Sequence, residues 1–322
     1  MTIPERLLDL YFSPINEDAL TQKPFSWRPA SWVKRFPSSD DRGHHARHQV
    51  LEELAKRPES VSERQPHQIG RTSVIDLASP ERLRGEGGSY DPERVLSVFL
   101  ASMIWGYGMV GYGPYRTQRV LDHGSDDAEH SALTQLVEVA EIAQRTEDGG
   151  LTDFKHIAKE RSAGRAYLKY LGPAFGTKFI YFLTKASKEV TTAPVLDSVV
   201  AGWIQRNAPE VERFRINSWN TESYGRYTET LQQWAEKLSP TTEGRQLEVD
   251  DVELLIFQDA RGISPSDTRS ENVTVESMLE DLGAEADARS GDAEPAGVRL
   301  VEELREWFAK YPSTEESDET EE

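Results

Sequence analysis

Residues 166–204 read AYLKYLGPAFGTKFIYFLTKASKEVTTAPVLDSVVAGWI, and this stretch decides the fold. Two apolar helical patterns flank LGPAFGTK, in which Pro173 and Gly176 are turn-forming residues. We therefore expect helices over 154–171 and 176–187, joined by a tight turn into a helical hairpin. Backbone N–H groups at the start of the second helix could bind a phosphate without reading base sequence.

The same stretch contains two side chains that could carry out chemistry. Lys178 lies at the start of the second predicted helix, and a deprotonated lysine is a nucleophile that can form a Schiff base with a sugar C1′. Asp197 follows nineteen residues later, where it is placed to cap a helix over 197–206. A carboxylate held by backbone N–H groups can stabilise positive charge on a deoxyribose. Taken singly, Lys178 is explained more simply as a surface residue, and Asp197 as a helix cap.

The rest of the chain indicates a mainly all-α protein. Asp91 and Pro92 are typical of a helix start before the apolar run VLSVFLASMIW, and further helical patterns cover 132–144, 221–238 and 249–260. No sustained alternation of apolar and polar residues predicts strands. We expect an irregular N-terminal segment over 1–90, a body of two helical subdomains over 91–262, and an acidic region over 263–322. That region reads as linker, one amphipathic helix and a partly disordered tail.

Charge is distributed unevenly along the chain, whose formal net charge is −19. Residues 240–322 contain 24 acids and 7 bases, whereas residues 1–239 contain 32 acids and 30 bases. Between 153 and 188, eight bases oppose two acids. This cluster of bases, which we call the basic island, favours a polyanionic partner such as nucleic acid. A solvated helix face whose charge is balanced by acids elsewhere in the fold would show the same sequence pattern.

Composition excludes several classes of protein and site. The chain has no cysteine, so it has no disulfide, thiolate zinc site or cysteine-ligated iron–sulfur cluster. No apolar run reaches the roughly 20 residues of a membrane span, and the first residues lack the pattern of a secretory signal. The histidines of GHHARH read as a solvated polar segment, so no metal site is expected. These features together predict a cytoplasmic protein.

The 166–204 stretch resembles the helix-hairpin-helix DNA glycosylase superfamily, and within it the 8-oxoguanine DNA glycosylase type. Pro173, Gly176, Thr177 and Lys178 fall on the family's hairpin pattern, and Val195, Leu196 and Asp197 fall on its aspartate pattern. The resemblance implies that Lys178 is the Schiff-base nucleophile and Asp197 the essential carboxylate. It also implies that the hairpin, with Phe175, binds double-stranded DNA carrying a modified base. No cofactor is implied, with a monovalent cation at the hairpin left open.

This chain departs from the family pattern at three positions. Ala174 replaces the first hairpin glycine, Val199 replaces a histidine that contacts phosphate, and Phe182 replaces a small residue against the flipped base. These changes leave the identity of the excised base open. The missing cysteines also exclude the iron–sulfur branch of the superfamily.

A glycine-rich segment over 103–119, MIWGYGMVGYGPYRTQR, could supply the side chains that fill the gap left by a flipped base. Its candidates for stacking or the base pocket are Trp105, Tyr107 and Met109, joined by Phe182 and Phe257 from elsewhere in the chain. Arg116 and Arg119 are placed to reach DNA phosphates. Aromatic packing in the core explains these aromatic residues about as well.

The sequence thus favours a monomeric glycosylase and abasic-site lyase that flips out a damaged purine of the 8-oxoguanine kind. A role in repair, at the nucleoid, or in anti-phage defence is left open. Two other readings also remain: a non-catalytic helix-hairpin-helix module that binds DNA, and a helical interaction protein that works through its acidic tail. A further hypothesis is that the tail occupies the basic island and suppresses non-specific DNA binding.

Overall fold

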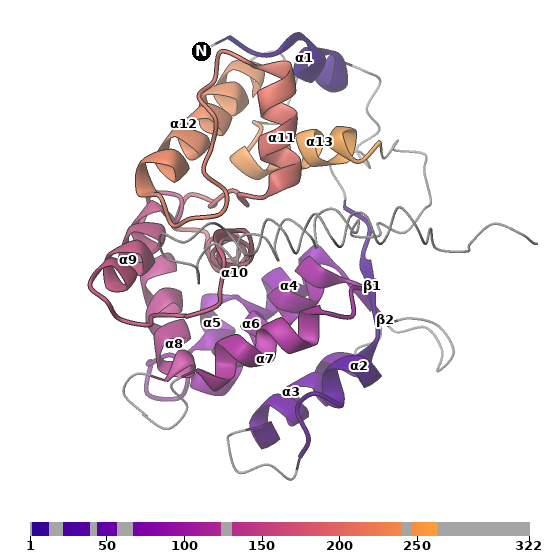
Figure 1. The fold of residues 1–322 in the computed structure, drawn as a ribbon, viewed down its shortest axis with the longest axis vertical. Helices are drawn as coiled ribbons and strands as arrows, with labels where there is room; N and C mark the ends of the chain where they lie inside the picture. Colours follow the sequence, from indigo (N-terminus) through magenta and orange to yellow (C-terminus); the bar gives the residue numbers. More distant parts are fainter. Residues whose placement is uncertain are drawn as a thin grey trace, which may run out of the picture. The chain divides into compact units, whose positions relative to one another are not determined.

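The computed structural model describes residues 2–12, 22–38, 44–56, 67–123, 131–239 and 246–262. The chain divides into two units, 1–272 and 273–322, and every described residue belongs to the first. Over the described residues the protein is mainly helical, with thirteen helices and one two-stranded sheet, as the sequence predicts (Figure 1). None of these helices is both long and apolar enough to cross a membrane. The linker, amphipathic helix and tail predicted after residue 262 lie outside the described residues.

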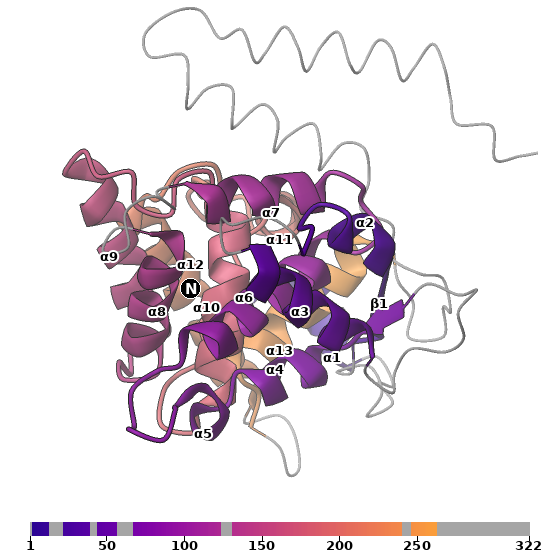
Figure 2. The same cartoon turned by 90° about the horizontal axis from the view of Figure 1, so that it is seen from below.

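The first hydrophobic core is formed by elements from the N-terminal two thirds of the chain. Its members are β1 (Phe25–Trp27), α2 (Pro29–Val33), α3 (His44–Ala55), β2 (His67–Ile69), α4 (Arg71–Leu77), α5 (Pro80–Leu83), α6 (Pro92–Tyr107), α7 (Gly113–Asp122), α8 (Ala132–Ala143) and α10 (Pro173–Ala186). Helix α6 is the centre of this core and packs against α3, α8 and α10 (Figure 2). Asp91 caps it as predicted, by accepting hydrogen bonds from the backbone N–H groups of Glu93 and Arg94.

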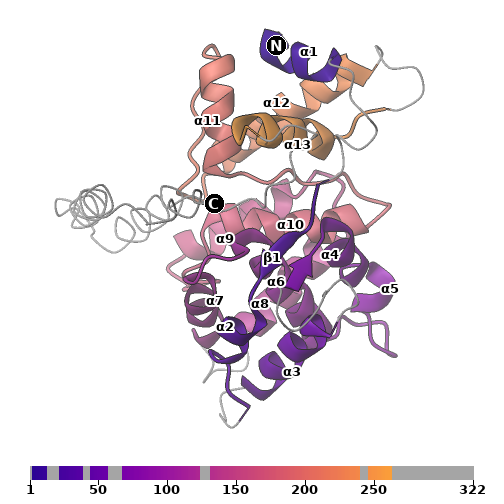
Figure 3. The same cartoon turned by 90° about the vertical axis from the view of Figure 1, so that its right-hand side faces the viewer.

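The second hydrophobic core is formed mostly by the C-terminal helices. Its members are α1 (Glu5–Phe12), α9 (Leu151–Ser162), α11 (Ser198–Asn207), α12 (Thr221–Leu238) and α13 (Val249–Ala260). Helix α1 joins from the other end of the chain, because Leu7 is fully buried here and Arg6 pairs with Asp259 of α13. Figures 1 and 3 show α10 lying between α11, α12 and α13 on one side and the other helices of the first core, such as α4 and α6, on the other.

The segment before residue 90 contributes to the first core through large aromatic side chains. Trp27 and Trp32 are each 1% exposed. Strand β1 pairs antiparallel with β2, so that Phe25 lies opposite Ile69. This pairing joins residues forty or more positions apart, which local sequence patterns do not reveal.

The predicted helix over 154–171 is wrong at its C-terminal end, because α9 ends at Ser162. Gly164 follows with a φ of 78°, and Tyr170 adopts a left-handed φ of 71°. The side chain of Arg161 organises the connection by donating to the carbonyl of Tyr167 at 2.9 Å and to that of Leu171 at 2.8 Å. These carbonyls therefore bond to a guanidinium instead of to a continuing helix.

The predicted tight turn at LGPAFGTK is likewise wrong. Helix α10 begins at Pro173, so the turn residues form its first turn, and residues 163–172 make the connection to α9. Proline is favoured at the first helical position, where its missing N–H has no intrahelical partner to lose. Gly176 is needed for close packing here, because a Cβ at this position would lie 2.3 Å from Cη2 of Trp219.

We predict that Asp153→Asn flattens the pH dependence of stability. Asp153, in the first turn of α9, is fully buried, and both of its carboxylate oxygens lack a hydrogen-bond partner among the described residues. Burial, reinforced by Asp148, raises its pKa well above the usual value. The folded protein therefore keeps a proton that the unfolded chain loses above about pH 4, so stability falls as pH rises, by up to about 1.4 kcal/mol per pH unit.

Urea unfolding measured at several pH values between about 5 and 8 checks this prediction. Asp153→Asn should lose less stability than wild type across that interval. Glu210→Gln, at an exposed position, is the matched control and should follow the wild-type slope. An equal slope for wild type and Asp153→Asn would contradict the prediction.

Candidate active site

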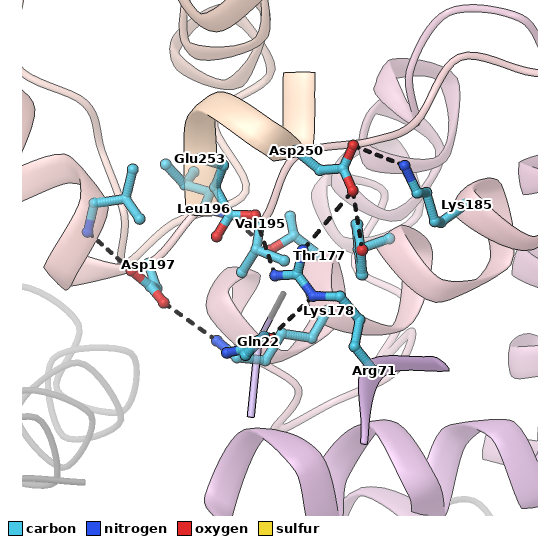
Figure 4. Close-up of polar contacts among 12 residues, drawn as sticks. Gln22, Arg71, Thr177, Lys178, Lys185, Val195, Leu196, Asp197, Asp250 and Glu253 are labelled. Carbon is cyan, nitrogen blue, oxygen red and sulfur yellow. Dashed lines mark hydrogen bonds and ion pairs between the residues drawn. The ribbon is translucent and has the colours of Figure 1, made fainter. Parts of the chain in front are cut away.

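Lys178 lies in the second turn of α10 and is almost completely enclosed, with 8% of its surface exposed. Its Nζ atom lies 3.5 Å from Oδ2 of Asp197 and 3.4 Å from the carbonyl oxygen of Ala174 (Figure 4). The structure thus brings together the two residues that the sequence singles out. A shielded ammonium–carboxylate contact of this kind is less screened by water than a surface pair.

Asp197 is held in place as the N-cap of α11. Its Oδ1 atom accepts hydrogen bonds from the backbone N–H groups of Val199 and Val200, each at 3.1 Å. Its other oxygen, Oδ2, is the one that faces Lys178. The carboxylate therefore has one oxygen bonded to the start of α11 and one directed at the lysine.

The segment 193–197, which leads into Asp197, is anchored to α10 by two threonine hydroxyls. Oγ1 of Thr177 accepts from the backbone N–H of Leu196 at 3.1 Å, and Oγ1 of Thr184 accepts from that of Ala193 at 3.0 Å. Thr177 is fully buried beside Lys178 in the chain. Thr177, predicted as a DNA contact, thus serves in this structure to hold the segment against α10.

Two tyrosines of α12 fix the same segment from its other side. The hydroxyl of Tyr224 donates to the carbonyl of Pro194 at 3.1 Å, and that of Tyr227 donates to the carbonyl of Val195 at 2.7 Å. Both tyrosines are completely buried. Because its backbone is bonded from two helices, the segment holds Asp197 in a defined position relative to Lys178.

Helix α6 packs closely against the start of α10 at Gly106. A Cβ there would lie 2.8 Å from Cε1 of Phe175 and 2.9 Å from Cδ of Lys178, so the absence of a side chain lets α10 approach. The ring of Phe175 stacks on Tyr107 with centroids 3.9 Å apart, and Lys178 Nζ lies 5.2 Å from the Phe175 centroid. The Phe175 ring, which is backed by Tyr107, therefore lies beside the Lys178 side chain.

The other residues proposed for base stacking occupy several environments. Trp105 and Phe182 are buried and meet edge to face with centroids 5.1 Å apart. Met109 is partly exposed in the turn after α6, and Phe257 is partly exposed under the guanidinium of Arg261, 5.6 Å from its centroid. Trp105 and Phe182 are therefore core residues in this conformation, and their role toward a base stays a prediction.

The residues predicted to contact DNA phosphates gather near the α10 N-terminus. Arg116 of α7 lines a small pocket of about 10 Å³. The other lining residues are Met103, Tyr107, Thr117, Val120, Tyr170, Leu171, Gly172 and Phe175. Arg116 and Gly172, the residue before Pro173, therefore line the same pocket.

Arg119 belongs to a row of alternating cations and tyrosines that sequence reasoning missed as a unit. Its guanidinium lies 3.9 Å from the Tyr170 centroid and 5.8 Å from that of Tyr115. Arg35 stacks over Tyr115 at 4.9 Å, and Lys169 over Tyr170 at 5.3 Å. We call these five residues the Arg–Tyr row. They come from α7 and from segments on either side of it in sequence, so only folding assembles them.

A buried polar cluster next to Lys178 was also missed. Arg71, at the first position of α4, donates through Nε to Gln22 at 3.0 Å and lies 3.8 Å from Asp250 and 4.0 Å from Glu253 (Figure 4). Lys185 Nζ lies 3.0 Å from Asp250. Acids at the start of a helix such as α13 are commonly explained as complements to its helix dipole. An acid inside the apolar run VELLIF was the available signal that Glu253 is buried.

Burial raises the pKa of Glu253 to about 8. Arg71 opposes this shift, whereas the negative charges of Asp197 and Asp250 add to it. Lys178 also acts on this carboxyl, in the direction of a lower pKa. The charges of both Lys178 and Asp197 thus act on the pKa of Glu253.

Comparison with known protein families identifies the family of the chain. Residues 18–257, about three quarters of the chain, match the family described as "Putative 8-oxoguanine DNA glycosylase OGG-like protein". No curated protein and no solved structure matches the chain. The matched range contains Lys178, Asp197, Arg71 and Glu253 together. The chain therefore belongs to this OGG-like family.

Proposed function

We propose that this protein excises a modified purine of the 8-oxoguanine kind from double-stranded DNA and then cleaves the strand as a lyase. The single observation that carries the proposal is the enclosed Lys178–Asp197 pair, with Nζ and Oδ2 at 3.5 Å. A lysine nucleophile and a fixed carboxylate are the two groups that a Schiff-base glycosylase requires. The family match over residues 18–257 supports the same class of substrate.

In the proposed reaction, the target nucleotide is flipped out of the duplex so that its C1′ comes next to Lys178. The glycosidic bond breaks, and Asp197 stabilises the positive charge that develops on the deoxyribose. Nζ of Lys178 bonds to C1′, and opening of the sugar ring leaves an imine. Loss of a proton from C2′ then permits β-elimination of the 3′ phosphate, which is the lyase step.

The direct test uses wild-type protein and duplexes that each contain one modified base, with 8-oxoguanine first. The proposal expects release of free base, a nicked strand, and a covalent protein–DNA adduct when borohydride reduces the imine. Unmodified duplex of the same sequence is the control. Base release without any trapped adduct would exclude the lysine mechanism, and absence of release from every modified purine would refute the proposed activity.

The Arg–Tyr row supplies a prediction about DNA affinity. Arg119→Gln should raise the Kd for a 20–30 base-pair duplex by about tenfold at about 0.1 M salt, and it should lower the slope of log K against log salt by about 0.9, because one phosphate contact is lost. Fluorescence anisotropy over a series of salt concentrations measures both quantities. The effect should be similar for unmodified and modified DNA, since phosphate contacts do not read sequence.

Arg145→Gln is the matched control for this prediction. Arg145 lies just past the end of α8, is largely exposed, and pairs with Glu141 at 3.2 Å. The exchange removes the same charge from a position outside the Arg–Tyr row, so its salt slope should stay near that of wild type. Equal slopes of log K against log salt for Arg119→Gln and wild type would show that Arg119 contacts no DNA phosphate.

A further inference from the structure

The first turns of α13 contain three buried acids, of which two have structural partners. Asp250 accepts from the Tyr181 hydroxyl at 3.1 Å and from Lys185 Nζ at 3.0 Å. Asp251 accepts from the backbone N–H of Glu248 at 2.9 Å and so helps to begin the helix. Both carboxylates are thus explained by the fold.

Glu253, the third acid, is not explained in this way. It is 3% exposed, and its Oε2 atom lacks a hydrogen-bond partner among the described residues. Nη2 of Arg71 lies 4.0 Å from that oxygen, beyond hydrogen-bond range. A buried polar atom left without a hydrogen bond destabilises the fold, so its presence calls for a reason beyond stability.

The side chain of Glu253 is directed at the proposed catalytic pair. Figure 4 shows it reaching from α13 toward the space that Lys178, Asp197 and Arg71 share. Its ionisation responds to the charges of all three residues. The oxygen without a hydrogen bond therefore belongs to a buried side chain beside Arg71 that is electrostatically coupled to Lys178 and Asp197.

A pKa of about 8 favours the protonated form of Glu253 at neutral pH. Burial is the largest cause of its raised pKa, about 8, and the groups around it leave this balance in place. The titratable groups that act on Glu253 or respond to it are Arg71 of α4, Lys178 and Tyr181 of α10, Asp197 before α11, Tyr224 and Tyr227 of α12, and Asp250 of α13. A carboxylic acid kept neutral near pH 7 can donate a proton to a reacting group.

We propose that Glu253 is the general acid that protonates the purine as it leaves. This inference rests on the proposed glycosylase activity and adds a third reacting group to Lys178 and Asp197. A neutral purine would depart as an anion if only the C1′–N9 bond broke, and a proton delivered to the base removes that cost. Asp197 is unsuited to this task, because its oxygens accept hydrogen bonds from α11 and face the Lys178 ammonium.

The proposed step balances in protons and electrons. The electron pair of the C1′–N9 bond passes to the purine, and the Glu253 proton passes to a ring nitrogen or oxygen of the same purine. The deoxyribose retains the positive charge until Nζ of Lys178 bonds to C1′. Lys178 must lose a proton before it bonds to C1′, and this proton passes to solvent, while Glu253 regains a proton from solvent after the base has left.

The test compares wild type, Glu253→Gln and Glu210→Gln in two assays. The first assay is single-turnover release of 8-oxoguanine from a duplex, between about pH 6 and pH 9.5, which spans the pKa of about 8. The second is borohydride trapping on a duplex that already contains an abasic site, where no base has to leave. Glutamine keeps the size of the side chain but has no acidic proton, and Glu210→Gln makes the same exchange at an exposed position.

We expect Glu253→Gln to release base at least about a hundredfold more slowly at pH 7, whereas trapping at the abasic site falls less than about threefold. The wild-type rate should decline above about pH 8, and the Glu253→Gln rate should lack that decline. Glu210→Gln should match wild type in both assays. The pH profile separates proton donation from a structural role, which would slow both assays together.

Three results would overturn the inference. One is base release by Glu253→Gln at the wild-type rate, and another is an unchanged alkaline decline in that variant. The third is an equal loss in both assays, which assigns Glu253 a structural role. If wild type neither releases base nor forms an adduct at the abasic site, the proposed function itself fails, and the inference fails with it.

Discussion

Lys178→Gln should abolish the borohydride-trapped adduct and slow base release by about a thousandfold or more, the scale of loss when an enzyme's nucleophile is removed. Glutamine has no amine that can form an imine with C1′, so the adduct should disappear on both 8-oxoguanine and abasic duplexes. The exchange conserves much of the side-chain length. It also keeps a donor that can bond to the carbonyl of Ala174, which now accepts from Nζ.

The control for this prediction is Lys188→Gln. Lys188 lies just past the end of α10, is exposed, and belongs to the same basic island. Its loss removes the same charge from the same region, so saturating protein should trap DNA as wild type does. A Lys178→Gln protein that still forms the adduct would show that another amine is the nucleophile.

Asp197→Asn should slow base release by about a hundred- to a thousandfold, because asparagine cannot stabilise positive charge on the deoxyribose. The fold should survive the exchange, since asparagine caps helices about as well as aspartate does. The amide oxygen can still accept from the N–H groups of Val199 and Val200, which Oδ1 of Asp197 now holds at 3.1 Å each. The measurement is single-turnover release of 8-oxoguanine, with unfolding followed in parallel.

Asp91→Asn is the matched control for Asp197→Asn. Asp91 caps α6 in the same way, by accepting hydrogen bonds from the N–H groups of Glu93 and Arg94. Both variants exchange a capping aspartate for asparagine, but only one lies against Lys178. Wild-type rates for Asp197→Asn would reduce its role to helix capping, which is how the residue reads from sequence alone.

Much of the secondary structure could be predicted, because its signals are local. Helix α12 covers 221–238 and α13 covers 249–260, as the amphipathic patterns indicate. The cap of α6 at Asp91 and that of α11 at Asp197 each depend on one side chain and the next few residues. These features involve interactions over fewer than about five positions, which the sequence displays directly.

The errors occur where a distant or unusual interaction decides the backbone. The helix predicted to reach residue 171 ends at Ser162, because Arg161 bonds to the carbonyls of Tyr167 and Leu171. No local pattern announces that a guanidinium will replace helical hydrogen bonds. The pairing of β1 with β2 depends in the same way on residues forty or more positions apart.

The sequence by itself determined the mainly helical class, the caps at Asp91 and Asp197, and the nineteen-residue interval between Lys178 and Asp197. Only the tertiary structure placed Nζ of Lys178 3.5 Å from Asp197, anchored segment 193–197 between α10 and α12, and buried Glu253 beside them. The physical reason is that capping and helical periodicity depend on near neighbours in the chain. The protonation of an acid depends instead on which distant helices exclude water from it.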